Sequence, residues 1–296
     1  MNKFLFLLCV SLFLFSCKKE SDSGKLKSDS DKLKIVVANF PLYDFAREIG
    51  GDFVSITMLF ASDHSYEPSP QDMIAIQNAN IFIYIGGESD EWVKKILNTT
   101  LNSKLSTLYF LENEESEDHH EEDHEEDNDE HIWTSPRNAI DMAKKIAEAF
   151  SEKDTLNKDF YMERNAKFTK NLEALDSMFT SIVENSKRKT IIFGDRFPFK
   201  HFAEDYGLEY HAAFPGCSNE TEPSAASVAF LIDKVKAEKI PVVFHIELSN
   251  ESIANTITEA TGAKKMLMHS VHNVSDLNES YLSLMKKNAE ALKEAL

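Results

Sequence analysis

The chain has 296 residues, of which 42 % are hydrophobic and 28 % are charged. These proportions are ordinary for a chain that buries a core, and they exclude a wholly disordered protein, a coiled-coil rod and a protein with many membrane spans. The net charge is −18, but residues 112–130 hold 13 acidic side chains and no Lys or Arg. The rest of the sequence carries a net charge of only −5 and no basic stripe that would neutralise phosphates, so we expect no nucleic-acid partner.

The first residues have the pattern of a bacterial export signal. A single Lys3 precedes an apolar run that ends at Ser16, which is shorter than the roughly 20 residues of a membrane-spanning helix. Leu14-Phe15-Ser16-Cys17 resembles a lipobox, so we expect a signal peptide at 1–16, lipid on Cys17 and a flexible polar tether at 17–33. An ordinary signal peptide with an incidental Cys is the alternative. After cleavage only Cys217 would remain besides Cys17, so we expect no intramolecular disulfide.

Short β-branched and aromatic runs alternate with amphipathic patterns along most of the chain. The predicted strands are 33–38, 53–59, 81–85, 107–110, 190–193, 208–212, 242–246 and 265–268. The predicted helices are 41–49, 70–79, 91–97, 136–150, 224–237, 251–260 and 280–295. This alternation predicts an α/β fold with parallel sheets that are covered by helices.

Residues 154–187 interrupt the alternation. They contain no Gly or Pro, and their apolar residues follow helical spacing, which predicts one helix of roughly 50 Å. We therefore expect two α/β lobes, 34–150 and 190–296, joined by a long rigid helix within 151–189. Because ligands bind beyond the carboxyl ends of parallel strands, the crevice between the lobes is the expected site.

Two histidine segments should face this crevice. His64 begins the segment His-Ser-Tyr-Glu-Pro-Ser-Pro after a predicted strand, and His131 begins His-Ile-Trp-Thr-Ser-Pro before a predicted helix. A neutral imidazole binds zinc, manganese or copper through one ring nitrogen. Trp133 could keep water away from such a site. Taken singly, the first segment also fits a surface loop, and the second fits a helix start capped by Thr134 or Ser135.

Together the two segments resemble the zinc- and manganese-binding solute receptors of ABC importers, and the resemblance extends over nearly all of the mature chain. It implies a two-lobed receptor that holds one metal ion in the crevice with four ligands, among them His64 and His131. It also implies delivery of the metal to an importer permease, without chemical turnover. We expect a lipid-anchored monomer outside the cytoplasm, at the cell membrane or in the periplasm.

The other two ligand positions depart from the family pattern. Arg196 stands where the family has a His or Glu before an aromatic-rich helix, and a guanidinium cannot ligate a cation. The neighbouring Asp195 is therefore the predicted third ligand. For the last position His272 is the nearest candidate, with His269 as its competitor. Two other side chains remain open as ligands: Cys217 and Glu247, the second of which could instead accept a hydrogen bond from Arg196.

The acidic run contains three further histidines, His119, His120 and His124. Zinc-selective members of the family carry a His- and acid-rich loop at this place, which implies weak and exchangeable zinc binding. The alternative is a solvated acidic loop without a metal role. Imidazole favours Zn²⁺ as the metal, and Mn²⁺ is the alternative because it prefers oxygen ligands.

Two other classes of function fit parts of the sequence. A zinc hydrolase needs an open coordination position and a general base, but no predicted helix carries a His-Glu-x-x-His segment, so we do not expect an enzyme. A surface adhesin could use the same fold, with or without metal transport.

Overall fold

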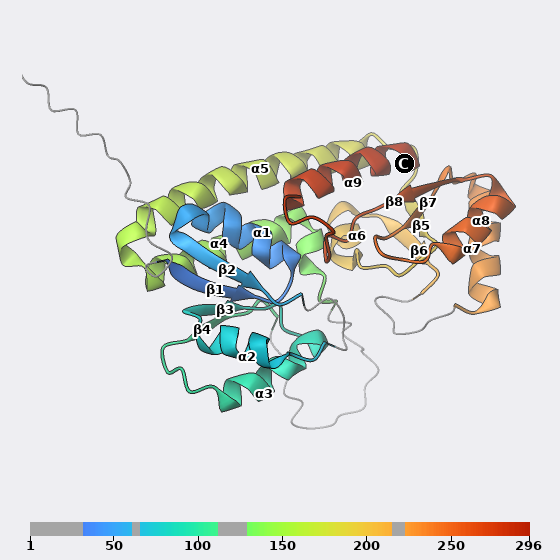
Figure 1. Ribbon diagram of the computed structural model, residues 1–296. Coiled ribbons are helices and arrows are strands. Elements are labelled where there is room, and N and C mark those ends of the chain that lie inside the picture. The colour runs from blue at the N-terminus through green and yellow to red at the C-terminus, as the bar shows by residue number, and fades with distance from the viewer. Residues whose placement is uncertain (1–31, 61–65, 112–128, 215–222) are drawn as a thin grey trace, which may run out of the picture.

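The computed structural model describes residues 32–60, 66–111, 129–214 and 223–296, and its two lobes are each built on a four-stranded parallel sheet (Figure 1). The first sheet has the order β2-β1-β3-β4, with β1 Leu33–Val37, β2 Val54–Met58, β3 Ile81–Ile83 and β4 Ser106–Leu108. The second has the order β6-β5-β7-β8, with β5 Thr190–Phe193, β6 Glu209–Ala212, β7 Val242–His245 and β8 Lys264–Leu267. The two-lobed parallel α/β fold is therefore confirmed.

Helices follow most strands, as a parallel sheet requires. In the first lobe they are α1 Phe40–Gly50, α2 Pro70–Gln77, α3 Glu91–Thr99 and α4 Pro136–Lys153. The long α5 Lys158–Glu184 leads to the second lobe, which contains α6 Lys200–Tyr206, α7 Ala225–Glu238, α8 Ser252–Thr261 and α9 Tyr281–Ala295. Each predicted strand overlaps an observed one, and α6 occupies the place of the expected aromatic-rich helix. No helix in the described ranges has the length and apolar character needed to cross a membrane.

The long helix is shorter than the sequence predicts. α5 has 27 residues, about 40 Å at 1.5 Å per residue, because α4 runs on to Lys153 and a 3-10 turn at Thr155–Asn157 separates the two helices. Asp154 makes this turn: its carboxylate accepts hydrogen bonds from Asn157 Nδ2 at 2.6 Å and from the Tyr161 hydroxyl at 3.0 Å. The turn therefore needs neither Gly nor Pro, the residues whose absence predicted a continuous helix.

One hydrophobic core continues from the first sheet through α5 into the second. It includes Ile35 of β1, Phe168 and Phe179 of α5, and Phe193 of β5, all buried. A second, smaller core lies around β7, α7 and α8. Because the lobes share apolar packing along α5, their separation would expose core surface, which opposes a wide hinge motion.

Helix α9 returns from the second lobe to pack beside α5 and against α1 (Figure 1). Asp44 on α1 accepts a hydrogen bond from the main-chain N–H of Tyr281 at 2.7 Å. Arg47 donates to the carbonyls of Leu277 at 2.6 Å and Glu279 at 2.8 Å. Burial raises the pKa of Asp44, although the Tyr281 N–H and the Arg47 guanidinium oppose that rise. These contacts anchor the start of α9 to the first lobe.

Candidate metal centre

His131 lies where the first lobe meets the second, immediately before a 3-10 turn at Ile132–Thr134 and the start of α4. Ser135 is the N-cap of α4, and its hydroxyl accepts hydrogen bonds from the N–H groups of Arg137 at 3.2 Å and Asn138 at 3.4 Å. Pro136 occupies the first helical position, where its missing N–H is not needed. The expected cap is thus present, and it fixes the main chain that carries His131.

Asp129 orients the His131 ring. One carboxylate oxygen accepts from the main-chain N–H of His131 at 2.8 Å and lies 2.7 Å from its Nδ1. A carboxylate can only accept, so Nδ1 carries the proton and the lone pair on Nε2 is the one that a metal ion could use. Burial of Asp129 opposes its ionisation, but the hydrogen bonds and charge of His131 outweigh this and lower the pKa of the carboxyl.

The rings of His131, His272 and Trp133 form an aromatic triangle in which His131 and Trp133 are buried and His272 is half-buried. The His131 and His272 rings meet nearly at right angles with 5.6 Å between their centroids, and Trp133 lies 5.1 Å from each. Trp133 is only 1 % exposed, so it walls the two imidazoles as the sequence suggested. The structure therefore places two predicted ligands, one from each lobe, in contact.

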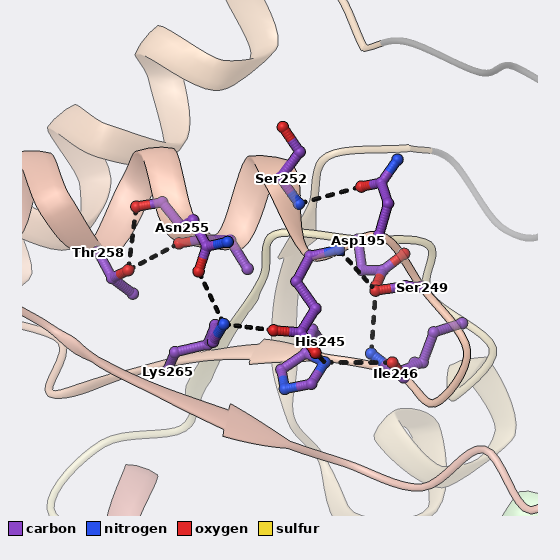
Figure 2. Close-up of polar contacts among 11 residues, drawn as sticks. Asp195, His245, Ile246, Ser249, Ser252, Asn255, Thr258 and Lys265 are labelled. Carbon is purple, nitrogen blue, oxygen red and sulfur yellow. Dashed lines mark hydrogen bonds and ion pairs between the residues drawn. The ribbon is translucent and has the colours of Figure 1, made fainter.

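Asp195 follows β5 and is 4 % exposed, and both of its oxygens accept main-chain hydrogen bonds. Oδ1 accepts from the N–H of Arg196 at 2.9 Å, and Oδ2 accepts from the N–H of Ile246 at 3.2 Å (Figure 2). The Arg196 guanidinium lies over the Phe214 ring, 5.3 Å from its centroid. Asp195 thus ties the end of β5 to the end of β7.

The competing ligand candidates have main-chain or side-chain partners of their own. The main chain of His269 is held by Asn288 on α9, and burial lowers the pKa of its ring. The carboxylate of Glu247 accepts from the N–H of Ser270 at 2.7 Å and from its hydroxyl at 2.5 Å. His201 of α6 donates to the carbonyl of Asp129 at 2.7 Å and so links the lobes.

Several predicted site residues lie outside the described residues: His64, Cys17, His119, His120, His124 and Cys217. Within the described ranges, no three His, Cys, Asp or Glu side chains form a group that could hold a metal ion. The described part of the chain thus contributes the pair His131 and His272, and the sequence places His64 on the loop after β2.

Sequence reasoning missed Asp129, the residue that orients His131. It stands two positions before His131, but it also belongs to the acidic run, so its local signal is hidden among 12 other carboxylates. Ser270 and its bonds to Glu247 were also missed, because nothing local marks a serine between two histidines as a contact point.

The family model described as "Zinc-uptake complex component A periplasmic" (ZnuA) matches residues 35–295, and the chain belongs to this family. The resemblance inferred from the two histidine segments is therefore confirmed. The family is one of transport components.

Curated relatives agree with this assignment. The zinc-binding lipoprotein AdcA of Streptococcus pneumoniae serotype 4 is 30 % identical over 97 % of this chain and 59 % of AdcA. The chain thus spans about three fifths of the length of that relative. The high-affinity zinc uptake system protein ZnuA of Bacillus subtilis is 30 % identical over 96 % of this chain and 94 % of that protein. PsaA of Streptococcus pneumoniae, a manganese ABC transporter substrate-binding lipoprotein, is 29 % identical over 96 % of this chain and 94 % of PsaA.

Solved structures share the fold. The Zn(II)-bound ZnuA-like domain of Streptococcus pneumoniae AdcA has a TM-score of 0.73 at 29 % identity, over 89 % of this chain and 98 % of that one. The metal-dependent lipoprotein YcdH of Bacillus subtilis has a TM-score of 0.76 at 27 % identity, over 90 % of this chain and 100 % of that one. The laminin-binding protein Lmb of Streptococcus agalactiae has a TM-score of 0.75 at 27 % identity, over 89 % of this chain and 99 % of that one. Lmb is described as a bifunctional protein with adhesin and metal transporting activity.

Proposed function

We propose that this protein is an extracytoplasmic receptor that captures Zn²⁺ and delivers it to the permease of an ABC importer. The observation that carries the proposal is the contact between His131 and His272, with 5.6 Å between ring centroids and Trp133 against both. Two imidazoles from different lobes, one of them held by a carboxylate, suit a borderline-soft cation such as Zn²⁺. The zinc-binding names of the AdcA and ZnuA relatives support the same cargo.

The proposed ligands are the imidazoles of His64, His131 and His272. Asp195 is the carboxylate that the sequence predicts as a ligand beside these histidines, but the two main-chain N–H groups bound to its oxygens support a structural role instead. A ligand role would require the carboxylate to share these oxygens with the metal. The two roles differ in what Asp195→Asn changes, which is zinc affinity for a ligand and folding stability for a structural residue.

The proposal also includes the membrane attachment of the receptor and the gathering of Zn²⁺ near its site. Lipid on Cys17 would tether a monomer outside the cytoplasm, as the lipoprotein names of AdcA and PsaA support. His119, His120 and His124 would gather Zn²⁺ weakly near the site, because imidazoles among many carboxylates attract and exchange the cation. Delivery involves no chemical turnover.

Zinc titration tests the proposal. The full chain in detergent would be titrated with Zn²⁺ and with Mn²⁺ by calorimetry against a competing chelator, alongside His64→Ala, His131→Ala and His272→Ala. We expect one sub-micromolar Zn²⁺ site that each substitution weakens by about a hundredfold or more. His211→Ala is the matched control, because His211 lies on β6 and pairs with Glu209 at 3.2 Å. Tight binding that survives all three substitutions would contradict the proposal.

Two outcomes would favour the alternatives. Tight binding of Mn²⁺ with weak binding of Zn²⁺ would identify a manganese receptor, which the similarity to PsaA makes the direct competitor. Binding to immobilised laminin without any tight metal site would favour an adhesin, a role that the name of Lmb suggests. Imidazole pairs argue for zinc, since manganese prefers oxygen ligands.

A further inference from the structure

The short segment between β8 and the His272 ring is fixed at each of its residues. At its start, Asn288 of α9 holds the main chain of His269 on both sides: Oδ1 accepts from its N–H at 2.7 Å, and Nδ2 donates to its carbonyl at 2.8 Å. Asn288 is fully buried, so this clamp is shielded from water. The direction in which the chain leaves β8 is therefore set by α9.

Ser270 is bound more extensively still. Glu247 accepts hydrogen bonds from its N–H and its hydroxyl, and the indole N–H of Trp133 donates to its carbonyl at 2.9 Å. The Ser270 hydroxyl oxygen in turn accepts from the main-chain N–H of His272 at 3.2 Å. Glu247 thus fixes Ser270, and Ser270 in turn bonds to the Trp133 indole through its carbonyl and to the main-chain N–H of His272 through its hydroxyl.

The main-chain conformation of Val271 requires the hydrogen bonds made by Ser270 next to it. The φ of Val271 is 62°, in the left-handed region that a β-branched residue rarely adopts because it strains the main chain, and its side chain is fully buried. A free loop would relax away from this conformation. The bonds to Ser270 on one side and the buried side chain hold the turn, and the turn aims the His272 ring at His131.

Glu247 lies on the loop between β7 and α8, and Figure 2 shows the contacts that Ile246 and Lys265 make on either side of this loop. At one end, the N–H of Ile246 donates to Asp195 at 3.2 Å. At the other, Glu251 pairs with Lys265, which also donates to Asn255 at 2.7 Å. Glu247 lies between these anchors, so its main chain is held on both sides.

We propose that Glu247 is a positioning residue that holds His272 in its metal-binding orientation through Ser270, and that it is not itself a metal ligand. The proposal rests on the function proposed above, since it assigns His272 to the zinc site. Both carboxylate oxygens of Glu247 are bound to Ser270, and the hydroxyl that they hold is bonded to His272. Glu247 would therefore act on the metal only indirectly, by fixing Ser270 and, through it, the main chain of His272.

A double-mutant cycle on zinc affinity tests this route. Glu247→Ala, Ser270→Ala and the double variant would be prepared in the full chain, with Glu259→Ala, an exposed glutamate of α8, as the matched control. If Glu247 acts through Ser270, each single variant loses about tenfold to a hundredfold in Zn²⁺ affinity, and the double loses no more than the stronger single. Glu247→Gln, which keeps one acceptor oxygen, retains part of the affinity.

A second readout needs no metal. The chain has two tryptophans, so ¹⁵N-labelled indole groups give two N–H resonances. In the zinc-free chain, Glu247→Ala and Ser270→Ala should both shift the Trp133 indole signal, because each removes at least one hydrogen bond that holds the segment whose Ser270 carbonyl the indole binds, whereas the Trp92 signal serves as the reference. Unchanged Trp133 signals in both variants would overturn the proposal even if zinc binding fell.

The outcomes separate this inference from the proposed function. Losses in affinity that multiply in the double variant, or a Ser270→Ala chain that binds zinc as the wild type does, would make Glu247 a direct ligand and overturn the positioning role. A wild-type chain without a tight zinc site would instead contradict the proposed function, while the indole shifts would still report whether Glu247 holds Ser270.

Discussion

Asp129 holds His131 twice with one oxygen, accepting from its main-chain N–H at 2.8 Å and from its ring Nδ1 at 2.7 Å. The carbonyl of the same residue accepts from His201 of the second lobe at 2.7 Å. Asp129 therefore fixes the tautomer of a proposed ligand and also joins the lobes beside it. Carboxylates that bind the far nitrogen of a ligating histidine raise its basicity and restrict its rotation.

Asp129→Asn should weaken zinc binding without removing a ligand. The amide can still accept one hydrogen bond, but it loses the charge that favours a protonated Nδ1 and a lone pair on Nε2. We expect a loss of about tenfold to a hundredfold in Zn²⁺ affinity, measured by chelator competition. Asp141→Asn, an exposed acid of α4, is the control and should bind as the wild type does. Equal affinities for the two variants would contradict the orienting role.

Asp195→Asn separates a structural role from a ligand role for this carboxylate. An amide oxygen can replace only one of the two acceptors that now bind Arg196 and Ile246. We expect the free energy of unfolding to fall by about 1–3 kcal/mol in urea titrations, with less than tenfold change in Zn²⁺ affinity. The exposed Asp233→Asn is the control for stability. A hundredfold loss of affinity at unchanged stability would instead establish Asp195 as a ligand.

Asp90 should make stability fall as the pH rises. Its carboxylate accepts from the N–H groups of Ile85 and Gly86, both at 2.9 Å, but burial outweighs these bonds and, with the nearby Glu130, raises its pKa to about 6. The unfolded chain ionises this group near pH ~3.9, so between these values the folded state binds more protons and loses stability with rising pH.

Asp90→Asn removes this dependence. Relative to the wild type, the variant should gain roughly 2 kcal/mol in unfolding free energy between about pH 4 and pH 7, from 1.36 kcal/mol per pKa unit. Urea unfolding at several pH values measures the difference. The exposed Asp52→Asn, carried through the same series, should show no such trend. A constant difference between Asp90→Asn and wild type across this range would refute the prediction.

Gly194→Ala should destabilise the second lobe because β5 and α8 approach too closely for a side chain. A Cβ at Gly194 would lie 2.5 Å from Cα and 2.7 Å from N of Ala254, which are main-chain atoms that cannot rotate away. We expect a loss of about 3 kcal/mol in unfolding free energy, measured in urea. Gly207→Ala is the comparison: with φ at 63° and open space around it, it should lose only about 1–2 kcal/mol. A smaller loss for Gly194→Ala than for Gly207→Ala would argue against this packing.

The strands and most helices could be predicted because their signals are local. Brief β-branched runs and helical spacing depend on neighbours within a few residues, and the parallel sheets follow from their alternation. The break between α4 and α5 could not be predicted, since Asp154 makes it with side-chain hydrogen bonds rather than with Gly or Pro. An aspartate that makes such a turn cannot be told from an aspartate within a helix by the residues around it.

For the site, the residue pattern alone predicted the family, the candidate histidines and their meeting beyond the carboxyl ends of parallel strands. It could not predict that His272 lies against His131, or that Trp133 donates to Ser270 from 137 positions away. Nor could it predict that the oxygens of Glu247 and Asp195 accept from main-chain and hydroxyl groups. A residue type sets which bonds are possible, whereas the packing of distant segments sets which partner comes within 3 Å, roughly the length of a hydrogen bond.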